Sequence, residues 1–262
     1  MEKRVWITGA SSGIGESCAC EYAAMGCRLI LTATRRNRLE AVAEKCRKSG
    51  AADVAVLPYD LSAADGIANL VGQAWAQFGG IDIVFCNAGI SQRTTVEDTS
   101  MEMTRQIMEV NFFAPVGIVK SVLPLMLEAG GGQIAVTSSV AGRFGFPLRC
   151  AYSASKHAQY GYFETLRAEY CRRNISVTIV CPGRVRTEIS ANALDKGGRK
   201  HGVIDPGQAG GLSAEKAAKK IVRAIAHRRR EVLVGRKELL MVGVKRFFPG
   251  LCAWLATKVK PV

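Results

Sequence analysis

The sequence lacks the spacings from which metal sites and disulfide frameworks are built. Its 262 residues include three histidines without metal-site spacing, and nine scattered cysteines without a Cys-x-x-Cys pair. An odd number of scattered cysteines is typical of reduced thiols in a cytoplasmic protein. We therefore expect no metal site, no disulfide framework and a cytoplasmic location.

The sequence also gives no sign of a membrane-spanning run or an internal repeat. No uninterrupted apolar run reaches the roughly 18 residues of a spanning helix, and we see no internal repeat or Pro/Ser-rich linker. Val5–Ile7 already has the composition of a strand, so we expect no signal peptide before it. The length suits one α/β domain with a large core.

Acidic residues are scarce near the C-terminus. The formal net charge is +14, and residues 213–262 contribute +10 of it, from thirteen Lys or Arg and three Glu. Such a segment can meet phosphate, anionic lipid, an acidic protein or nucleic acid, or simply form a solvated helix. It lacks interleaved stacking aromatics, so we expect no nucleic-acid partner.

Strand-like and helical segments alternate along the first 234 residues. The expected strands are residues 5–7, 27–32, 53–57, 81–85, 133–137, 175–180 and 231–234. The expected helices are residues 16–25, 35–48, 64–78, 101–127, 151–173 and 213–227, the fourth bent or divided at Pro115 and Pro124. This alternation predicts a doubly wound, Rossmann-type α/β sandwich with a seven-stranded parallel sheet and helices on both faces.

A glycine-rich turn joins the first strand to the first helix. It has the pattern Gly-x-x-x-Gly-x-Gly, in residues Thr8 to Gly15. Glycines let such a turn tighten and let a pyrophosphate approach the backbone at the helix N-terminus. The second strand ends at Ala33-Thr34-Arg35-Arg36, with no carboxylate for a ribose 2′-hydroxyl. We therefore predict a dinucleotide site that prefers NADP(H), with NAD(H) possible.

Tyr152 and Lys156 lie one helical turn apart on one face. A free tyrosine has a pKa of about 10. A cation at ~4 Å is worth roughly 1–4 kcal/mol, which would lower that pKa by about one to three units. Such a pair is most often a half-buried ring beside a solvated lysine. The neighbouring motifs favour an acid–base tyrosine here.

Together these features resemble the single-domain short-chain dehydrogenases/reductases from Val5 to about Val234. The motifs are Thr8-Gly9 with Gly13 and Gly15, Asp60, Asn87-Ala88-Gly89, Asn111, Ser139, Tyr152 with Lys156, and Pro182-Gly183 with Thr187. Cys86 departs from the family pattern, in which many members have an Asn. The stretches 147–158, 166–169 and 190–194 are similar to a narrower branch, the member-7B-like dehydrogenases/reductases, relatives of the 11β-hydroxysteroid dehydrogenases.

The resemblance implies an NAD(P)-dependent oxidoreductase acting on CH–OH groups. Tyr152 would transfer the proton, Lys156 would lower its pKa and hold the nicotinamide ribose, Ser139 would polarise the carbonyl, and Asn111 would hold a water that links Lys156 to solvent. The implied cofactor-binding residues are Thr8, Gly9, Ser11, Ser12, Gly13, Ile14, Gly15, Thr34, Arg35, Arg36, Asp60, Leu61, Asn87, Ala88, Gly89, Tyr152, Lys156, Pro182, Gly183, Val185 and Thr187.

The expected substrate is a lipophilic carbonyl or secondary alcohol, similar to a steroid or another lipid. Ligands in this fold bind at the carboxyl ends of the strands. The loops there supply the candidate pocket residues Ile90, Ser139, Phe144, Phe146 and Leu148. The aromatics could instead pack the lid or a subunit contact. A 3-oxoacyl-carrier-protein reductase is an alternative activity, and a non-catalytic dinucleotide-binding regulator is another.

We expect residues 1–235 to form the catalytic domain, with an irregular substrate lid at about 184–212, and residues 236–262 to extend that domain. Two short apolar segments, 238–248 and 251–255, are split by Pro249-Gly250 and edged by Lys and Arg up to Lys260. They could lie in a membrane interface, which would make the chain a peripheral membrane protein. They could instead cover the core or pack against a second subunit. Family members usually pair through the helices that hold Asn111 and Tyr152, so we expect a homodimer or homotetramer.

Overall fold

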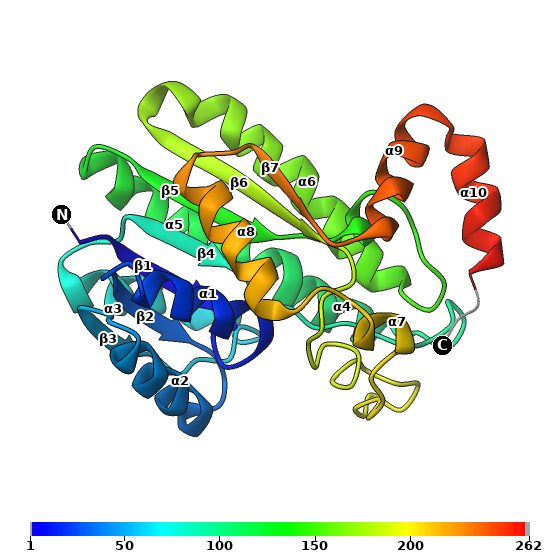
Figure 1. Ribbon diagram of the computed structural model, residues 1–262, viewed down its shortest axis with the longest axis horizontal. Coiled ribbons are helices and arrows are strands. Elements are labelled where there is room, and N and C mark those ends of the chain that lie inside the picture. Colours follow the sequence, from blue (N-terminus) through cyan, green and yellow to red (C-terminus); the bar gives the residue numbers. More distant parts are fainter. Residues whose placement is uncertain (1, 260–262) are drawn as a thin grey trace.

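The computed structural model describes residues 2–259, which form a seven-stranded parallel sheet between two layers of helices (Figure 1). The strand order is β3-β2-β1-β4-β5-β6-β7. The strands are β1 (Arg4–Thr8), β2 (Arg28–Thr32), β3 (Asp53–Val56), β4 (Ile83–Cys86), β5 (Gly132–Thr137), β6 (Ile175–Pro182) and β7 (Glu231–Val234). The predicted doubly wound α/β sandwich is thus confirmed. The order reverses between β1 and β4, where ligands bind in such sheets.

Side chains alternate across the sheet and fill a core on each face. Along β1, Val5 and Ile7 join one core, and Trp6 joins the other. The helices of the first core are α1 (Gly13–Ala23), α2 (Arg36–Lys48) and α8 (Ala214–Ala226). Those of the second are α3 (Ile67–Phe78), α5 (Ala114–Glu128) and α6 (Cys150–Tyr170). The shorter elements are η1 (Ala64–Gly66), α4 (Met101–Met108), η2 (Glu109–Phe113), η3 (Val140–Gly142), η4 (Cys171–Arg173), α7 (Pro206–Ala209) and η5 (Lys237–Leu239).

The helical run Met101–Glu128 is continuous but not uniform. The π-helical turn η2 lies between α4 and α5, Pro115 is in the first turn of α5, and Pro124 lies inside α5 without ending it. By length and composition the run could cross a membrane, although polar residues interrupt its apolar stretches. Of its most apolar window, 44% is buried, and Ile118, Val119 and Val122 belong to the core. Its apolar character is therefore that of a core helix.

The C-terminal extension forms a helical hairpin, α9 (Leu240–Phe247) and α10 (Pro249–Lys258), that projects beside the end of β7 (Figure 1). The expected break at Pro249-Gly250 is wrong by one residue. Phe248 leaves the helical region, with φ −134° and ψ 64°, and Pro249 opens α10, where its missing N–H costs nothing. Lys260, expected to belong to the basic edge, lies outside the described residues.

Candidate active site

The glycine turn lies tightly against the end of β4. Gly9 has φ +65°, and a Cβ on it would come within 2.7 Å of the Ala88 Cα. A Cβ on Gly15 would overlap the Gly9 carbonyl oxygen. Larger residues at these two positions would therefore displace the turn, because the conflicting atoms are backbone. The shape fits a close approach of a pyrophosphate to the backbone.

Thr8 and Asn87 fasten the turn to the ends of three strands. The Thr8 Oγ1 atom accepts hydrogen bonds from the backbone N–H groups of Asn87 at 3.1 Å and Ala88 at 3.2 Å. The Asn87 amide donates to the Thr8 carbonyl at 3.2 Å and accepts from the Thr137 hydroxyl at 3.1 Å. Both side chains thereby fix the position of the glycine turn relative to the carboxyl ends of the strands.

A cavity of about 460 Å³, here named the glycine-loop cavity, runs along this edge of the sheet. Of the predicted cofactor residues, it is lined by Gly9, Ser11, Ser12, Gly13, Ile14, Thr34, Arg35, Asp60, Leu61, Asn87, Ala88, Gly89, Tyr152, Lys156 and Thr187. Thr8 and Gly15 are buried in the turn beside it. Arg36 does not line the cavity, and its Nη1 atom instead lies 3.6 Å from the Glu40 carboxylate on the surface of α2.

A second cavity of about 510 Å³, the lid cavity, lies beneath the lid segment (residues 184–212) and the C-terminal hairpin. Ser139, Phe146, Pro182, Gly183 and Val185 line it. Tyr152 lines both cavities, together with Ile14, Thr137, Thr187 and Ile189. Of the predicted catalytic residues, Lys156 lines only the glycine-loop cavity and Ser139 only the lid cavity. The phenol of Tyr152 therefore stands where the two cavities meet.

Lys156 is buried, and its surroundings disfavour its charge. Desolvation lowers the pKa of its ammonium from the ordinary 10.5 to about 7. Its Nζ atom donates a hydrogen bond of 2.6 Å to the Thr137 carbonyl and lies 5.7 Å from the centroid of the Tyr152 ring. The lysine is thus only partly charged near neutral pH.

The pKa of Tyr152 differs from the sequence expectation in its direction. Burial raises it above 10, while interaction with the Ser139 hydroxyl and the positive charges of Arg93 and Arg149 oppose the rise. The expected lowering by Lys156 does not dominate, because desolvation of the phenol has the largest effect on this pKa and the lysine is itself only partly charged. The free site therefore favours a protonated Tyr152.

Asn111 is fully buried within the π-helical turn η2. Its side chain accepts from the Ile90 N–H at 2.9 Å and donates to the Ile90 carbonyl and the Ser155 hydroxyl, both at 3.0 Å. Its own carbonyl accepts a 2.6 Å hydrogen bond from the Gln159 amide. Asn111 thus ties the loop after β4 to α6. Its expected role in holding a water remains a prediction.

The predicted substrate residues are divided among different environments. Ser139 and Phe146 line the lid cavity. Phe144 is buried behind Phe146, with ring centroids 4.7 Å apart, and packs against Cys181 and Cys252. Ile90 lines the glycine-loop cavity instead. Leu148 adopts a positive φ of 61° and lines neither cavity.

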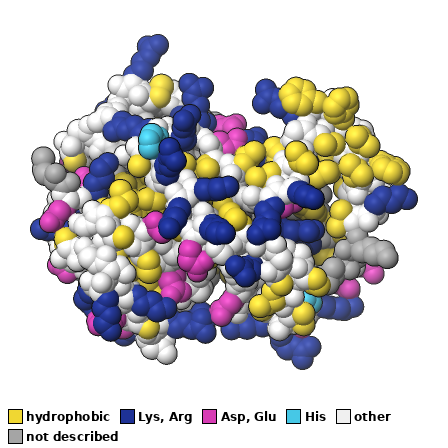
Figure 2. Space-filling model, viewed as in Figure 1, with side chains coloured by type: hydrophobic (Ala, Val, Ile, Leu, Met, Phe, Trp, Pro, Cys, Tyr) yellow, Lys and Arg dark blue, Asp and Glu magenta, His cyan; other side chains and the backbone are white. Residues whose placement is uncertain are grey.

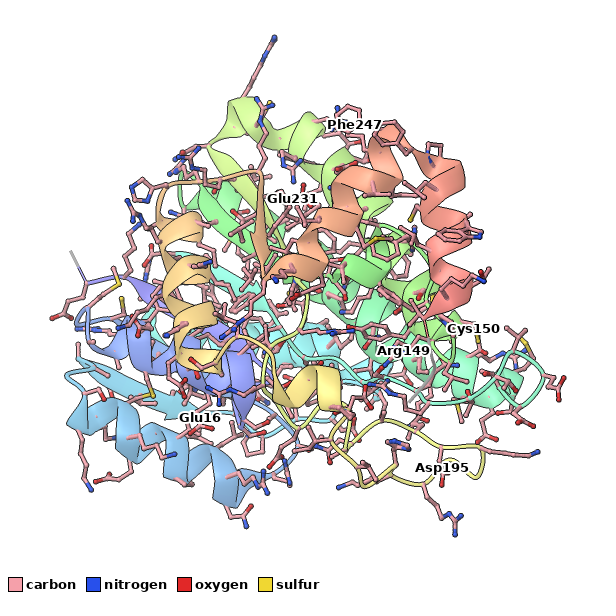
Figure 3. The ribbon with its side chains drawn as sticks, turned by 45° about the vertical axis from the view of Figure 1, so that its right-hand side comes forward. Glu16, Arg149, Cys150, Asp195, Glu231 and Phe247 are labelled. Carbon is pink, nitrogen blue, oxygen red and sulfur yellow. The ribbon has the colours of Figure 1, made fainter. Side chains whose placement is uncertain are left out.

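Sequence reasoning missed several polar residues of the lid cavity. Arg93 follows β4, Arg149 precedes α6, and Asp205 belongs to the lid segment. Lys237 and Glu238 enter from η5, with Met241 from α9. Arg149 lies at the start of α6, away from Phe247 at the outer end of the hairpin (Figure 3). No expected site role was attached to these residues, and only the fold brings them together.

Gln92 was also missed, although it positions Tyr152 directly. Its side chain is fully buried, and its Oε1 atom accepts a 3.1 Å hydrogen bond from the backbone N–H of Tyr152. Its Nε2 atom donates to the hydroxyls of Thr94 at 3.0 Å and Thr99 at 2.9 Å. Arg149, at the start of α6, provides no side-chain cap. A residue distant in sequence therefore caps the helix that carries Tyr152.

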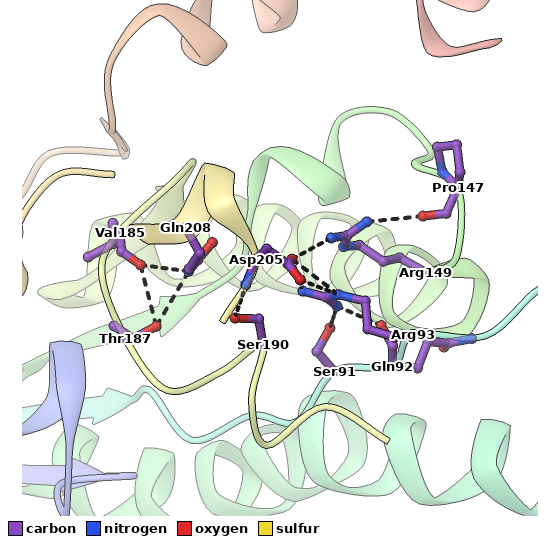
Figure 4. A network of polar contacts seen from close by, with 10 residues as sticks. All are labelled: Ser91, Gln92, Arg93, Pro147, Arg149, Val185, Thr187, Ser190, Asp205 and Gln208. Carbon is purple, nitrogen blue, oxygen red and sulfur yellow. Dashed lines mark hydrogen bonds and ion pairs between the residues drawn. The ribbon is translucent and has the colours of Figure 1, made fainter. Parts of the chain in front are cut away.

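Backbone hydrogen bonds hold the middle of the lid segment against the loop after β4 and join the two ends of the segment to each other. Leu194 donates to Ser91 at 2.9 Å and accepts from Arg93 at 2.8 Å, and Leu212 donates to Arg184 at 2.8 Å. The Gln208 amide donates to the Val185 carbonyl at 2.6 Å (Figure 4). The segment expected to be irregular also contains the short helix α7. It therefore closes over both cavities as an ordered cover.

Comparisons with known proteins agree with this geometry. The family model for short chain dehydrogenases matches residues 3–197. The chain is 38% identical over 263 residues to the Drosophila melanogaster dehydrogenase/reductase SDR family protein 7-like, covering 98% of this chain and 80% of that protein. It is 37% identical to the mouse (Mus musculus) dehydrogenase/reductase SDR family member 7B, covering 88% of this chain and 72% of that protein.

Solved structures of two such enzymes are similar in fold. A short chain dehydrogenase/reductase from Burkholderia phymatum in complex with NAD superposes with a TM-score of 0.84 at 26% identity, covering 100% of this chain and 96% of that one. An alcohol dehydrogenase from the archaeon Thermococcus sibiricus, complexed with 5-hydroxy-NADP, has a TM-score of 0.77 at 25% identity, covering 90% and 97%.

Proposed function

The chain belongs to the short-chain dehydrogenase family and is an oxidoreductase, and we propose that it interconverts a carbonyl group and a secondary alcohol with NADP(H). The observation that carries this proposal is the position of Tyr152, which lines both the glycine-loop cavity and the lid cavity. A dinucleotide fits the first cavity because the turn at Gly9 and Gly15 has no room for a Cβ. When bound, its nicotinamide supplies or accepts the hydride.

The chain's own residues handle the proton and orient the reacting oxygen. The raised pKa of Tyr152 keeps its phenol protonated, which is the form that a carbonyl reduction requires of a proton donor. Ser139 lies in the same cavity and offers a hydroxyl to the same oxygen. Lys156 lies on the cofactor side, where its ammonium group would hold ribose hydroxyls. Each role is expected from the placement of these three groups.

The proposed preference for NADP(H) rests on the end of β2. Thr34 and Arg35 line the glycine-loop cavity, and no carboxylate is present in Ala33–Arg36. One charge-assisted contact to a phosphate is worth about 1.5–3 kcal/mol, or roughly ten- to hundredfold in affinity. Dissociation constants for NADPH and NADH, measured by fluorescence titration, test this preference. Equal or tighter NADH binding would overturn it.

The proposed substrate is bulky and largely apolar. Phe146, Met241 and Ile189 line the lid cavity, together with Val140 and the polar groups described above. A panel of steroids, retinoids, long-chain ketones, a 3-oxoacyl thioester and small sugars, ranked by kcat/KM with NADPH, tests this proposal. Higher kcat/KM for the sugars would refute it. A preference for the thioester would favour the acyl-carrier alternative instead.

We also propose that the C-terminal hairpin makes peripheral contact with an anionic membrane. Figure 2 shows hydrophobic side chains gathered over α9 and α10, with Lys and Arg beside them. Leu240, Phe247, Phe248, Leu251 and Trp254 are each at least 47% exposed. The basic neighbours are Lys245, Arg246 and Lys258. Such an arrangement suits a membrane interface, where each cation adds about 1 kcal/mol near an anionic surface.

The inner side of the hairpin packs against the rest of the protein, so deleting the hairpin would also disturb the fold. Point variants on its outer side therefore test membrane contact better than truncation. Cys252 is buried against Phe144, and Met241 lines the lid cavity. Co-sedimentation with anionic vesicles at low salt should fall several-fold for the double variant Phe247→Ser/Trp254→Ser. Met25→Ser removes a residue that is 60% exposed on another surface and should have no effect. Equal pelleting of all three proteins would contradict membrane contact through the hairpin.

We also propose that the protein forms a homodimer or homotetramer in which subunits pair through the helices that hold Asn111 and Tyr152. Phe113 is 52% exposed beside Asn111, and its ring lies 5.2 Å from that of Phe112. Burying this pair between two subunits would remove apolar surface from water. Analytical ultracentrifugation of the wild type and of Phe113→Glu tests it, with dissociation expected for the variant. A monomeric wild type would refute the proposal.

A further inference from the structure

Three charged side chains, Arg93, Arg149 and Asp205, form a buried cluster (Figure 4). All three line the lid cavity, which Tyr152 also lines. The Asp205 Oδ2 atom accepts from Arg93 at 2.6 Å and from Arg149 at 2.9 Å. The side chains of Arg93 and Asp205 are only 4% and 10% exposed, and that of Arg149 is 21% exposed. Two guanidinium groups share one carboxylate, so the cluster carries a net charge of +1.

An uncompensated charge at a buried site is expensive, because desolvation removes the hydration that would stabilise it. Here the three residues come from three separate segments, namely the loop after β4, the residue before α6 and the lid segment. Apolar side chains could hold these three segments together without the free-energy cost of burying charges. The arrangement therefore suggests a use for the charge itself.

Hydrogen bonds and the chain itself connect the cluster to the start of α6, which carries Tyr152. Arg93 also donates to the Ser91 hydroxyl at 3.1 Å and to the Gln92 carbonyl at 2.6 Å. The Gln92 side chain in turn accepts from the Tyr152 N–H. Arg149 is followed by α6, whose third residue is Tyr152. Both arginines are thus connected to the start of α6, Arg93 through Gln92 and Arg149 through the chain itself.

We propose that Arg93 and Arg149, held together by Asp205, are positioning residues that stabilise the phenolate of Tyr152 from the lid side while fastening the lid over it. Lys156 would act on the same phenol from the cofactor side. The inference rests on the proposed function only in taking Tyr152 as the acid–base group. It adds a second, permanent source of positive charge to the site.

The other groups that face Tyr152 explain why a second source is useful. Lys156 on α6 has a pKa near 7 and is only partly charged, whereas a guanidinium stays charged at every relevant pH. Ser139, after β5, opposes the rise in the pKa of Tyr152, and Cys181 on β6 adds to it. Lys237 and Glu238 of η5 bring one charge of each sign to the same cavity, and Arg184 of the lid segment brings a further positive charge. Both arginines act to lower the pKa of Tyr152.

The test is a titration of Tyr152 in the free protein, which needs neither substrate nor turnover. Near-ultraviolet tyrosinate absorbance is recorded against pH, and the same trace from each protein carrying Tyr152→Phe is subtracted. Arg149→Met should raise the pKa of Tyr152 by about one unit, whereas Arg149→Lys should change it little. Asp205→Asn should lower it, because a negative charge is lost. If the cluster had a purely structural role, Arg149→Met and Asp205→Asn would not shift the pKa of Tyr152 in opposite directions.

Arg199→Met is the matched control, because Arg199 also belongs to the lid segment and pairs with Asp195, yet its side chain is 84% exposed. It should leave the titration unchanged. Far-ultraviolet circular dichroism at each pH identifies any variant that unfolds, and the alkaline limb of the kcat/KM profile gives the same shift independently. The proposal is overturned if Arg149→Met and Asp205→Asn shift the pKa in the same direction, or if neither shifts it. Because no turnover is needed, failure here is distinguishable from failure of the proposed oxidoreductase function.

Discussion

Replacing Lys156 by methionine is expected to stabilise the folded protein near neutral pH while removing its function. Burial lowers the pKa of this lysine from 10.5 to about 7. Between these two values the unfolded chain binds a proton that the folded chain does not bind. The stability of the wild type must therefore rise with pH across this window and become level below it. The methionine variant lacks this dependence.

The size of the effect on stability follows from the difference between the pKa of Lys156 in the unfolded and in the folded protein. At ~1.4 kcal/mol per unit, the buried lysine costs the fold up to about 4 kcal/mol near pH 7, and about 2 kcal/mol two pH units higher. The variant also loses the hydrogen bond to the Thr137 carbonyl, which offsets roughly 1–3 kcal/mol at every pH. We expect a net gain of about 1–3 kcal/mol near pH 7. The gain should shrink by about 2 kcal/mol over the next two pH units.

Urea unfolding followed by circular dichroism, without cofactor, measures this difference at both pH values. Lys120→Met, at an exposed position on α5, reports the effect of the substitution alone. A difference between Lys156→Met and wild type that stays constant with pH would refute the reasoning. It would mean that Lys156 stays charged in the folded protein, and that its partners compensate fully for burial.

Three further outcomes follow from the geometry of the site. Gly15→Ala should weaken dinucleotide binding at least tenfold in a fluorescence titration while the fold is kept, because the new Cβ would overlap the Gly9 carbonyl oxygen. Arg35→Ala should weaken NADPH binding about tenfold and leave NADH binding unchanged, whereas Arg36→Ala should alter neither, since Arg36 pairs with Glu40 on the surface. Gln92→Leu should lower the unfolding free energy by about 1–3 kcal/mol in urea unfolding, because the Tyr152 N–H loses its buried acceptor.

The sheet and its cofactor edge could be predicted from sequence because their signals are local. Buried strands such as Arg28–Thr32 are short apolar runs, and the turn before α1 needs glycine wherever it meets backbone. α1 begins at Gly13 rather than at the expected Glu16, because the helix starts inside the glycine turn itself. The order and type of the helices and strands could thus be predicted from the sequence pattern, whereas the residues at which they begin and end depend on tertiary contacts.

The lid cavity could not be predicted in the same way. Of the five expected pocket residues, only Ser139 and Phe146 line this cavity, and Phe144 instead packs inward against Cys181 and Cys252. Arg93, Arg149 and Asp205 are separated along the chain and form a cluster only because the lid segment folds back over the loop after β4. The pKa of Tyr152 likewise depends on burial and on these distant charges. Spacing along one helix does not contain that information.

We propose that Tyr152 transfers the proton in an NADPH-dependent carbonyl reduction, and the variant Tyr152→Phe examines that step alone. The substitution keeps the ring at the junction of the two cavities and removes only the hydroxyl. With NADPH and the best carbonyl substrate from the panel, we predict that the variant loses turnover while its dissociation constant for NADPH stays within about twofold of wild type. A variant that retained more than a few per cent of the wild-type kcat would contradict the account, because another group would then have to be the acid.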